Sequence, residues 1–261
     1  MRNILIFLLL LAVWSCKQTP KSTETDMVSQ SDEALGRILF IVSNQDTYGS
    51  SDINAANHFA EIVFAYDVFK TSGYAIDFVS PEGGAIPVGY LNTSDAIEKQ
   101  YLYNFEFMSL LKNTRKPEEI DPSEYLAVYY GGGGAAMYGV PENETIQKIA
   151  MDIYEKNNGI VSAICHGTAG IVNLKTNDGK YLYDGKKVNG FPDLFENMDA
   201  AYYKQFPFSI EQTITKRGGL FEYSEEGWDN FHIAEGRLIT GQDPTAATSV
   251  AEKVVSALSS N

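Results

Sequence analysis

Residues 159–167 read Gly-Ile-Val-Ser-Ala-Ile-Cys-His-Gly and carry the most informative pattern in the chain. The apolar, β-branched first half predicts a short buried strand, and residues 167–174 predict the start of a helix. Cys165 therefore falls at a turn from strand to helix, beside free backbone N–H groups and the positive end of a helix dipole. Such a position lowers the pKa of a thiol and favours the nucleophilic thiolate. Because His166 follows directly, the stretch predicts cysteine chemistry.

The composition allows a large folded core and argues against one class of partner. The chain has 261 residues, 44% of them hydrophobic, with 14 Phe and 16 Tyr. That length is enough for one large domain or two small ones. The formal net charge is −14, and nucleic-acid phosphates would repel such a chain. We therefore expect no nucleic-acid partner.

The N-terminal residues predict a targeting signal rather than a part of the folded domain. Its apolar run, Ile4 to Trp14, is too short to span a bilayer comfortably and is typical of a secretory signal. Ser15 and Cys16 follow the run, and Cys16 resembles the lipidated cysteine of a bacterial lipoprotein signal. We therefore expect a signal peptide over residues 1–16, lipidation of Cys16, a polar tether over residues 17–36, and anchoring in the bacterial cell envelope, periplasmic or outer-membrane. An uncleaved N-terminal anchor is the alternative.

The cysteine count adds weight to Cys165. The chain has two cysteines, and lipidation of Cys16 would leave Cys165 without a disulfide partner. An unpaired thiol in an oxidising compartment is a liability, so its presence needs a reason, and catalysis is one. A buried, inert cysteine is the alternative.

Alternating strand and helix patterns predict an α/β fold with a parallel sheet. The expected strands are residues 37–42, 74–79, 125–130, 159–163, 220–223, 231–234 and 238–240. The expected helices are residues 52–71, 95–111, 142–157, 208–217 and 244–258, and a hairpin is expected over 180–188. We therefore expect a single domain over residues 37–261, with residues from about 87 to 122 as an insertion over the sheet.

Five motifs, in this order, resemble the superfamily of PfpI proteases and DJ-one, the class I glutamine amidotransferase-like proteins. They are Phe78–Gly84, Gly131–Gly134, Ala163–Gly167, Gly185–Phe191 and Leu238–Pro244. The resemblance covers most of residues 37–258 and is nearest to the branch of glyoxalase III and chaperones. It implies a flavodoxin-like three-layer sandwich with a mostly parallel central sheet and a nucleophile elbow.

Three residues are expected to carry the chemistry. Cys165 is the expected nucleophile, and His166 is the expected general base and acid, because an imidazole titrates near neutral pH. A third group should orient the imidazole. The resemblance places an acid shortly after Pro192, where Glu196 is the best match and Asp193 is the alternative.

Further candidates lie in the first helix and in the glycine loop. In the superfamily a glutamate of this helix hydrogen-bonds the thiol, and Glu61 matches it; burial would raise its pKa and let it carry a proton. The backbone N–H groups of Gly132 and Gly133 are expected to hold an oxyanion, unless this run is only a tight turn. His58 and His232 are expected to be structural. Because no phosphate loop, dinucleotide fingerprint or metal cluster appears, we expect no cofactor and no metal.

The resemblance implies a cofactor-free, glyoxalase III-like hydro-lyase of the D-lactate dehydratase type, which converts 2-oxoaldehydes such as methylglyoxal into 2-hydroxy acids. A protein deglycase, or a cysteine peptidase or amidase with the same residues, is one alternative. A stress-related holdase chaperone or a thiol redox sensor is another. The expected partners are a small aldehyde substrate, the membrane through the lipid anchor, and a second copy of the chain in a homodimer.

Overall fold

Buried apolar strands form the centre of the molecule. The computed structural model describes residues 34–260, so the predicted signal peptide, Cys16 and most of the tether lie outside the described residues. The central sheet has the order β3-β1-β5-β6-β10-β9. Its strands are β1 (Arg37–Ile41), β3 (Ala75–Val79), β5 (Tyr125–Tyr130), β6 (Ile160–Ile164), β9 (His232–Glu235) and β10 (Leu238–Gly241). All neighbours are parallel except β9, which runs antiparallel to β10 at one edge.

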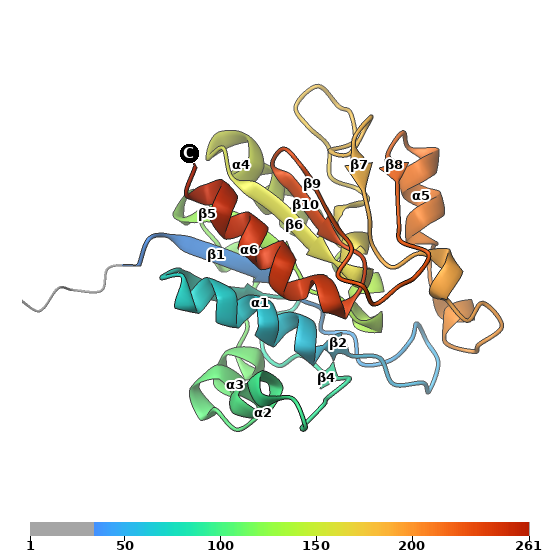
Figure 1. Ribbon diagram of the computed structural model, residues 1–261, viewed down its shortest axis with the longest axis horizontal. Coiled ribbons are helices and arrows are strands. Elements are labelled where there is room, and N and C mark those ends of the chain that lie inside the picture. Colours follow the sequence, from blue (N-terminus) through green and yellow to red (C-terminus); the bar gives the residue numbers. More distant parts are fainter. Residues whose placement is uncertain (1–33, 261) are drawn as a thin grey trace, which may run out of the picture. The chain divides into compact units, whose positions relative to one another are not determined.

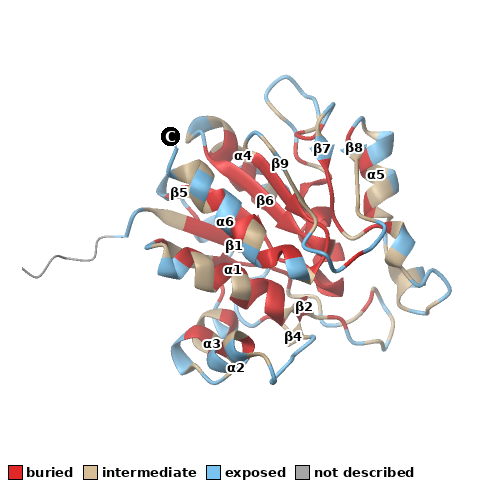
Figure 2. Ribbon diagram, in the orientation of Figure 1, coloured by how far each residue is buried: buried red, intermediate tan, exposed pale blue. Residues whose placement is uncertain are grey.

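Helices cover both faces of this sheet, with α1 and α6 on one face and α4 on the other. The α-helices of the described chain are α1 (Phe59–Thr71), α2 (Ala96–Leu102), α3 (Phe105–Lys112), α4 (Glu144–Lys156), α5 (Ile210–Lys216) and α6 (Ala247–Leu258). Ile38 and Phe40 of β1 pack in one hydrophobic core with α1 and α6, whereas Leu39 and Ile41 pack in a second core with α4. Figure 1 shows α1 and α6 side by side over the sheet, and Figure 2 shows the buried strands between the layers. The predicted three-layer α/β sandwich is confirmed.

The strand order determines where a site can form. Because β1, β5 and β6 are parallel neighbours, their carboxyl ends meet at one edge of the sheet. The order of strands reverses around β1, with β3 on one side and β5 on the other. Open α/β sheets bind ligands in the crevice at such a switch point. The glycine loop 131–134 follows β5 and Cys165 follows β6, so both lie at this edge.

The segment from 87 to 122 shares the main core instead of forming a core of its own. Tyr101, Phe107 and Leu111 belong to the same buried cluster as the residues of α1. The single helix predicted over 95–111 is wrong, because the segment contains two helices, α2 and α3. Asn104 separates them: its side chain accepts the N–H of Phe107 and so begins the second helix.

Two other local predictions are wrong because polar groups find distant partners. The first helix begins at Phe59 and not near Asp52. The side chain of Asn57 hydrogen-bonds both the N–H and the carbonyl group of Ser43. Asn57 and His58 form the short strand β2 (Asn57–His58), which pairs with β4 (Val88–Gly89). The predicted hairpin over 180–188 is absent. There, β7 (Lys187–Val188) pairs in parallel with β8 (Leu220–Phe221).

Candidate active site

Cys165 lies at the sharp turn that follows β6. Its φ is +54°, in the left-handed region that non-glycine residues adopt only when their surroundings impose it. The turn also packs closely against the end of β5, since a Cβ at Gly167 would overlap the carbonyl oxygen of Tyr130. The turn is the nucleophile elbow that the resemblance implies. It holds the cysteine at the floor of a cavity, where the residue is 4% exposed.

The predicted lowering of the thiol pKa is wrong. Burial raises the pKa of Cys165 well above its usual value, and the nearby Glu61 raises it further, while the N–H of His166 opposes the rise. The helix predicted to start at residue 167 is a 3₁₀ helix, Cys165–Ile171, so it begins two residues earlier than the sequence predicts. A buried sulfur therefore needs a neighbour that accepts its proton as it reacts.

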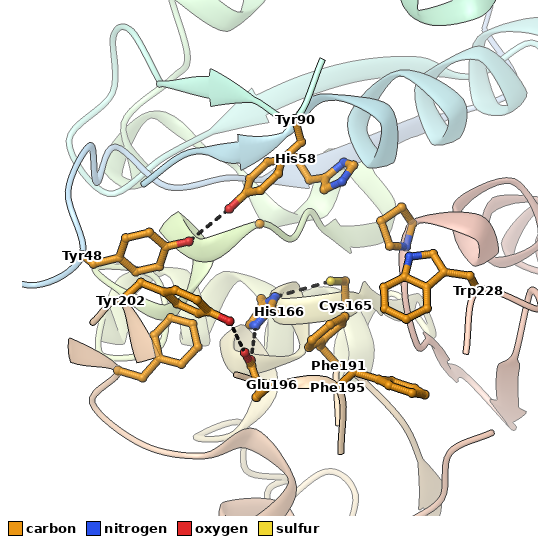
Figure 3. Close-up of a pocket in the computed structure, with 13 residues that line it drawn as sticks. Tyr48, His58, Tyr90, Cys165, His166, Phe191, Phe195, Glu196, Tyr202 and Trp228 are labelled. Atoms are coloured by element: carbon orange, nitrogen blue, oxygen red, sulfur yellow. Dashed lines mark hydrogen bonds and ion pairs between the residues drawn. The ribbon is translucent and has the colours of Figure 1, made fainter. Parts of the chain in front are cut away.

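His166 is that neighbour. Its Nδ1 lies 3.4 Å from Sγ of Cys165, and its Nε2 lies 2.6 Å from Oε1 of Glu196. The other oxygen of Glu196 accepts the hydroxyl of Tyr202 at 3.1 Å. Because the carboxyl oxygen faces Nε2, we assign the imidazole proton to Nε2 and the lone pair to Nδ1. Figure 3 shows this chain of contacts from the sulfur to Tyr202.

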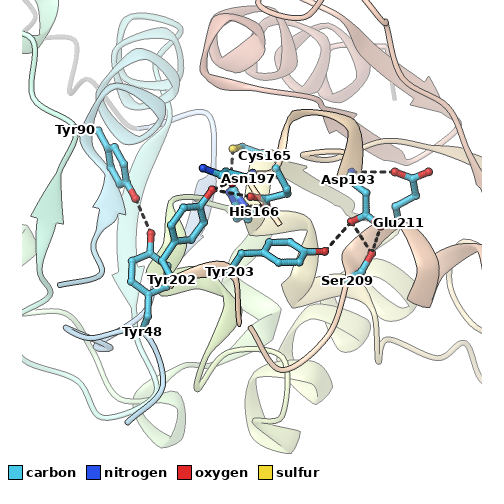
Figure 4. A network of polar contacts seen from close by, with 11 residues as sticks. Tyr48, Tyr90, Cys165, His166, Asp193, Asn197, Tyr202, Tyr203, Ser209 and Glu211 are labelled. Carbon is cyan, nitrogen blue, oxygen red and sulfur yellow. Dashed lines mark hydrogen bonds and ion pairs between the residues drawn. The ribbon is translucent and has the colours of Figure 1, made fainter. Parts of the chain in front are cut away.

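The two acids predicted near Pro192 take different partners. Glu196 contacts the imidazole, whereas Asp193 accepts hydrogen bonds from the side chains of Ser209 and Gln212. Figure 4 shows Tyr203 directed towards Asp193, in contrast to Tyr202, which reaches the other acid. The structure thus brings Glu196, and not the alternative, to the imidazole.

Glu61 is fully buried on α1. Its Oε2 accepts the N–H of Gly132 at 2.9 Å, and its Oε1 has no hydrogen-bond partner among the described residues. Burial raises the pKa of Glu61 to about 8, although the Cys165 thiol and the Gly132 N–H oppose that rise. The carboxyl therefore keeps its proton at neutral pH. As a carboxylate, Glu61 raises the pKa of the thiol, whereas in its protonated form it carries no charge and can donate a hydrogen bond to the sulfur.

The two glycines predicted to hold an oxyanion differ. The prediction for Gly132 is wrong, because its N–H already donates to Glu61 and is not free to hold an oxyanion. Gly133 lines the cavity with a φ of +93°, and a Cβ there would overlap the carbonyl oxygen of Ala56. Its N–H donates to no other described residue. Gly133 thus has a free donor at the cavity.

The cavity above the sulfur has a volume of about 420 Å³ and mostly aromatic walls. Residues far apart in the sequence line it, among them Tyr48, His58, Tyr90, Phe191, Tyr202 and Trp228. Sequence reasoning did not assign them to a site, and it predicts a structural role for His58. The only signal for these lining residues was the presence of aromatic side chains in polar, glycine-containing loops. A loop sequence does not show whether such a side chain points into a cavity or into solvent.

Two general properties concern the described part of the chain. Within residues 34–260, no three His, Cys, Asp or Glu side chains are grouped as ligands for a metal ion. None of the helices there has both the length and the apolar character needed to cross a bilayer.

The fold and the site define an α/β protein with a cysteine at a nucleophile elbow, and comparison with known proteins identifies the family. Residues 55–257 match the DJ-1/PfpI family. The chain is 32% identical to Glyoxalase 3 of Candida albicans over 86% of its own length and 98% of that protein. It is 28% identical to the glutathione-independent glyoxalase HSP31 of Saccharomyces cerevisiae, over 85% and 97% of the two chains. The crystal structure of glyoxalase III from Candida albicans is similar with a TM-score of 0.77 and 30% identity, over 85% and 97% of the chains. The chain therefore belongs to the DJ-1/PfpI family, in its glyoxalase III branch.

Comparison with these relatives corrects the predicted cellular location. The two yeast glyoxalases match over 97–98% of their own lengths, which leaves almost nothing in them to correspond to a lipoprotein leader. They give no support for a lipid anchor or for an envelope location. The predictions of a lipoprotein signal and of a lipid-anchored envelope protein are therefore wrong, because a short apolar run ending in cysteine is too unspecific a pattern.

Proposed function

We propose that this protein is a glutathione-independent glyoxalase that converts a small 2-oxoaldehyde, such as methylglyoxal, into a 2-hydroxy acid without a cofactor. One observation carries the proposal: the sulfur of Cys165 lies between His166, paired with Glu196, and the protonated Glu61, at the floor of an aromatic cavity. The glyoxalase names of the relatives support the same chemistry.

The first step is addition of the thiol to the aldehyde. The S–H proton passes to Nδ1 of His166 as sulfur bonds to the aldehyde carbon, C1. Glu196 holds the imidazolium that forms, in the manner of any oriented nucleophile–base pair. The N–H of Gly133 faces the developing oxyanion. Return of the proton to that oxygen gives a hemithioacetal and a neutral imidazole.

The second step moves a proton from C1 to C2. His166 is again neutral and accepts the C1 proton, which leaves an enediolate with its charge on the C2 oxygen. It then returns this proton to C2, while the hydroxyl proton on C1 passes to the C2 oxygen and the C1 carbonyl forms. Glu61 keeps its own proton at neutral pH because burial raises its pKa to about 8, so it acts as a donor and not as the base. The product is a thioester of the 2-hydroxy acid.

The third step is hydrolysis of this thioester. His166 takes a proton from water as the hydroxide attacks C1. The C–S bond then breaks while the imidazolium returns that proton to the leaving sulfur, which releases the acid and the thiol. Overall, one aldehyde and one water give one 2-hydroxy acid. C1 is oxidised and C2 is reduced within the same molecule, so the balanced reaction needs no external oxidant or reductant.

The direct test is lactate formation from methylglyoxal in the absence of glutathione. We expect wild-type protein to form lactate, and Cys165→Ser and Cys165→Ala to lose at least about 1,000-fold in kcat/KM, because the covalent intermediate can no longer form. His232→Asn is a suitable control, since its ring bonds only the carbonyl of Asn230 on an outer loop. An inactive wild type, or an active Cys165→Ser variant, would contradict the proposal.

The surroundings of the sulfur also weigh against one alternative. A thiol redox sensor requires an accessible thiol of low pKa. Cys165 is 4% exposed and its pKa is raised by burial, so it is poorly suited to that role. A homodimer remains a prediction from the resemblance, and light scattering of the purified protein tests it.

A further inference from the structure

His58 is an ordered polar residue of the cavity wall that the steps above do not use. Its backbone N–H donates to the carbonyl oxygen of Gly132 at 2.8 Å, which fixes the start of α1 against the glycine loop. Its ring stacks on Tyr90, with centroids 4.8 Å apart and planes inclined by 2°. Figure 3 shows His58 and Tyr90 on one wall, across from Cys165 and His166. The imidazole is therefore held facing the reacting groups.

The ring of His58 lacks polar partners within the described chain. Its Nδ1 is buried without a hydrogen bond. Burial and, to a smaller extent, the neighbouring His166 lower the pKa of His58 to about 4. The imidazole is thus neutral and carries one N–H donor. Nδ1 is covered by protein, so Nε2, which has no hydrogen bond to the described residues either, is the ring nitrogen that a ligand in the cavity could reach.

We propose that His58 donates a hydrogen bond to the C2 oxygen of the bound 2-oxoaldehyde. The inference rests on the proposed function and extends it. When the C1 proton leaves the hemithioacetal, negative charge develops on the C2 oxygen, and a fixed neutral N–H stabilises that charge. His58 keeps its own proton throughout, so the proton balance of the reaction is unchanged. His58 would then be a catalytic residue, working opposite the pair of Cys165 and His166.

The experiment separates this role from the stacking on Tyr90. His58→Phe keeps an aromatic ring against Tyr90 but removes both nitrogens, whereas His58→Gln keeps an N–H donor. We expect His58→Phe to lose about 100-fold in kcat with methylglyoxal, as for loss of one oxyanion donor, and His58→Gln to lose less. Alkylation of Cys165 by iodoacetamide should proceed at the wild-type rate in both variants. Equal kcat in wild type and His58→Phe would overturn the proposal.

A binding measurement keeps this test independent of turnover. Acetohydroxamate carries two adjacent oxygens like those of an enediolate, and its affinity can be measured by calorimetry. We expect at least about 10-fold weaker binding to His58→Phe than to wild type, with His58→Gln in between. Unchanged affinity in His58→Phe, or no binding to wild type, would overturn the role of His58. Inactivity of the wild type towards methylglyoxal would instead defeat the glyoxalase proposal, and the hydroxamate series would still decide the role of His58. Thermal unfolding of both variants shows whether they remain folded.

Discussion

Two carboxyl groups serve the same site from different surroundings. Glu61, on α1, is fully buried, accepts one backbone N–H, and has its pKa raised to about 8 by burial. Glu196, on the loop that follows β7, contacts the imidazole of His166 and accepts the hydroxyl of Tyr202. One acid is placed to hold a proton, and the other is placed to accept hydrogen bonds. The comparison teaches that residue type alone does not assign a role, because the environment separates two chemically similar side chains.

The largest expected effect comes from removing the acceptor role of Glu196. In Glu196→Gln the amide can donate to Nε2 of His166, which favours the tautomer with its proton on Nδ1, facing the sulfur. Such a ring cannot accept the thiol proton, so we expect kcat for lactate formation to fall about 1,000-fold or more. Stopped or continuous assays of lactate formation measure it.

A matched control lies a few residues away. Asp193→Asn makes the same chemical change at the alternative acid, which bonds Ser209 and Gln212 and not the imidazole. Its activity should stay close to that of wild type. A loss of kcat of less than 10-fold in Glu196→Gln, or an equal loss in both variants, would contradict the assignment of Glu196 as the acid that orients the imidazole.

The central sheet was predictable because its signal is local. The strands β1, β5 and β6 are continuous apolar runs, and only burial on both faces of a parallel sheet accommodates such runs. The start of the first helix at Phe59 was not predictable, because the residues before it form contacts with partners distant in sequence, such as Asn57 with Ser43. Local propensity cannot foresee such contacts.

The candidate site was predictable in part for the same reason. Cys165 and His166 form a local motif, and the resemblance pointed to Glu61 and Glu196 by their order in the chain. The direction of the thiol pKa was wrong because burial depends on packing around the turn, which no short pattern reports. The cavity-facing position of His58 depends on the glycine loop, seventy-odd residues later, and was missed as well.

The next expected effect tests whether Glu61 is protonated in the folded protein, through the pH dependence of the free energy of unfolding. Its pKa is about 8 in the folded protein and near the ordinary value of 4.5 when unfolded. Between these values the folded state keeps a proton that the unfolded state releases. The stabilising contribution is therefore complete below about pH 4.5 and is lost as the pH rises towards 8. Glu61→Gln lacks this dependence.

Urea unfolding at a series of pH values measures this difference. We expect the unfolding free energy of wild type to fall, relative to Glu61→Gln, by up to about 1.4 kcal/mol per pH unit between pH 5 and 8. Cys165→Ala is the control: it keeps Glu61 buried, so its pH slope should resemble that of wild type. Parallel curves for wild type and Glu61→Gln would mean that the carboxyl is ionised in the folded protein, like a carboxylate on the surface.

The smallest expected effect concerns the second contact of Glu196. Tyr202→Phe removes the 3.1 Å hydrogen bond to its Oε2 and leaves the 2.6 Å contact with the imidazole. Because one hydrogen bond contributes about 1 kcal/mol, kcat should fall about 3- to 10-fold with KM unchanged, as for a residue that positions another. Tyr203→Phe is the control, since that hydroxyl faces Asp193. Equal kcat in the two variants would mean that His166 alone orients Glu196. The difference between the two carboxyl groups would then depend on a single ring nitrogen.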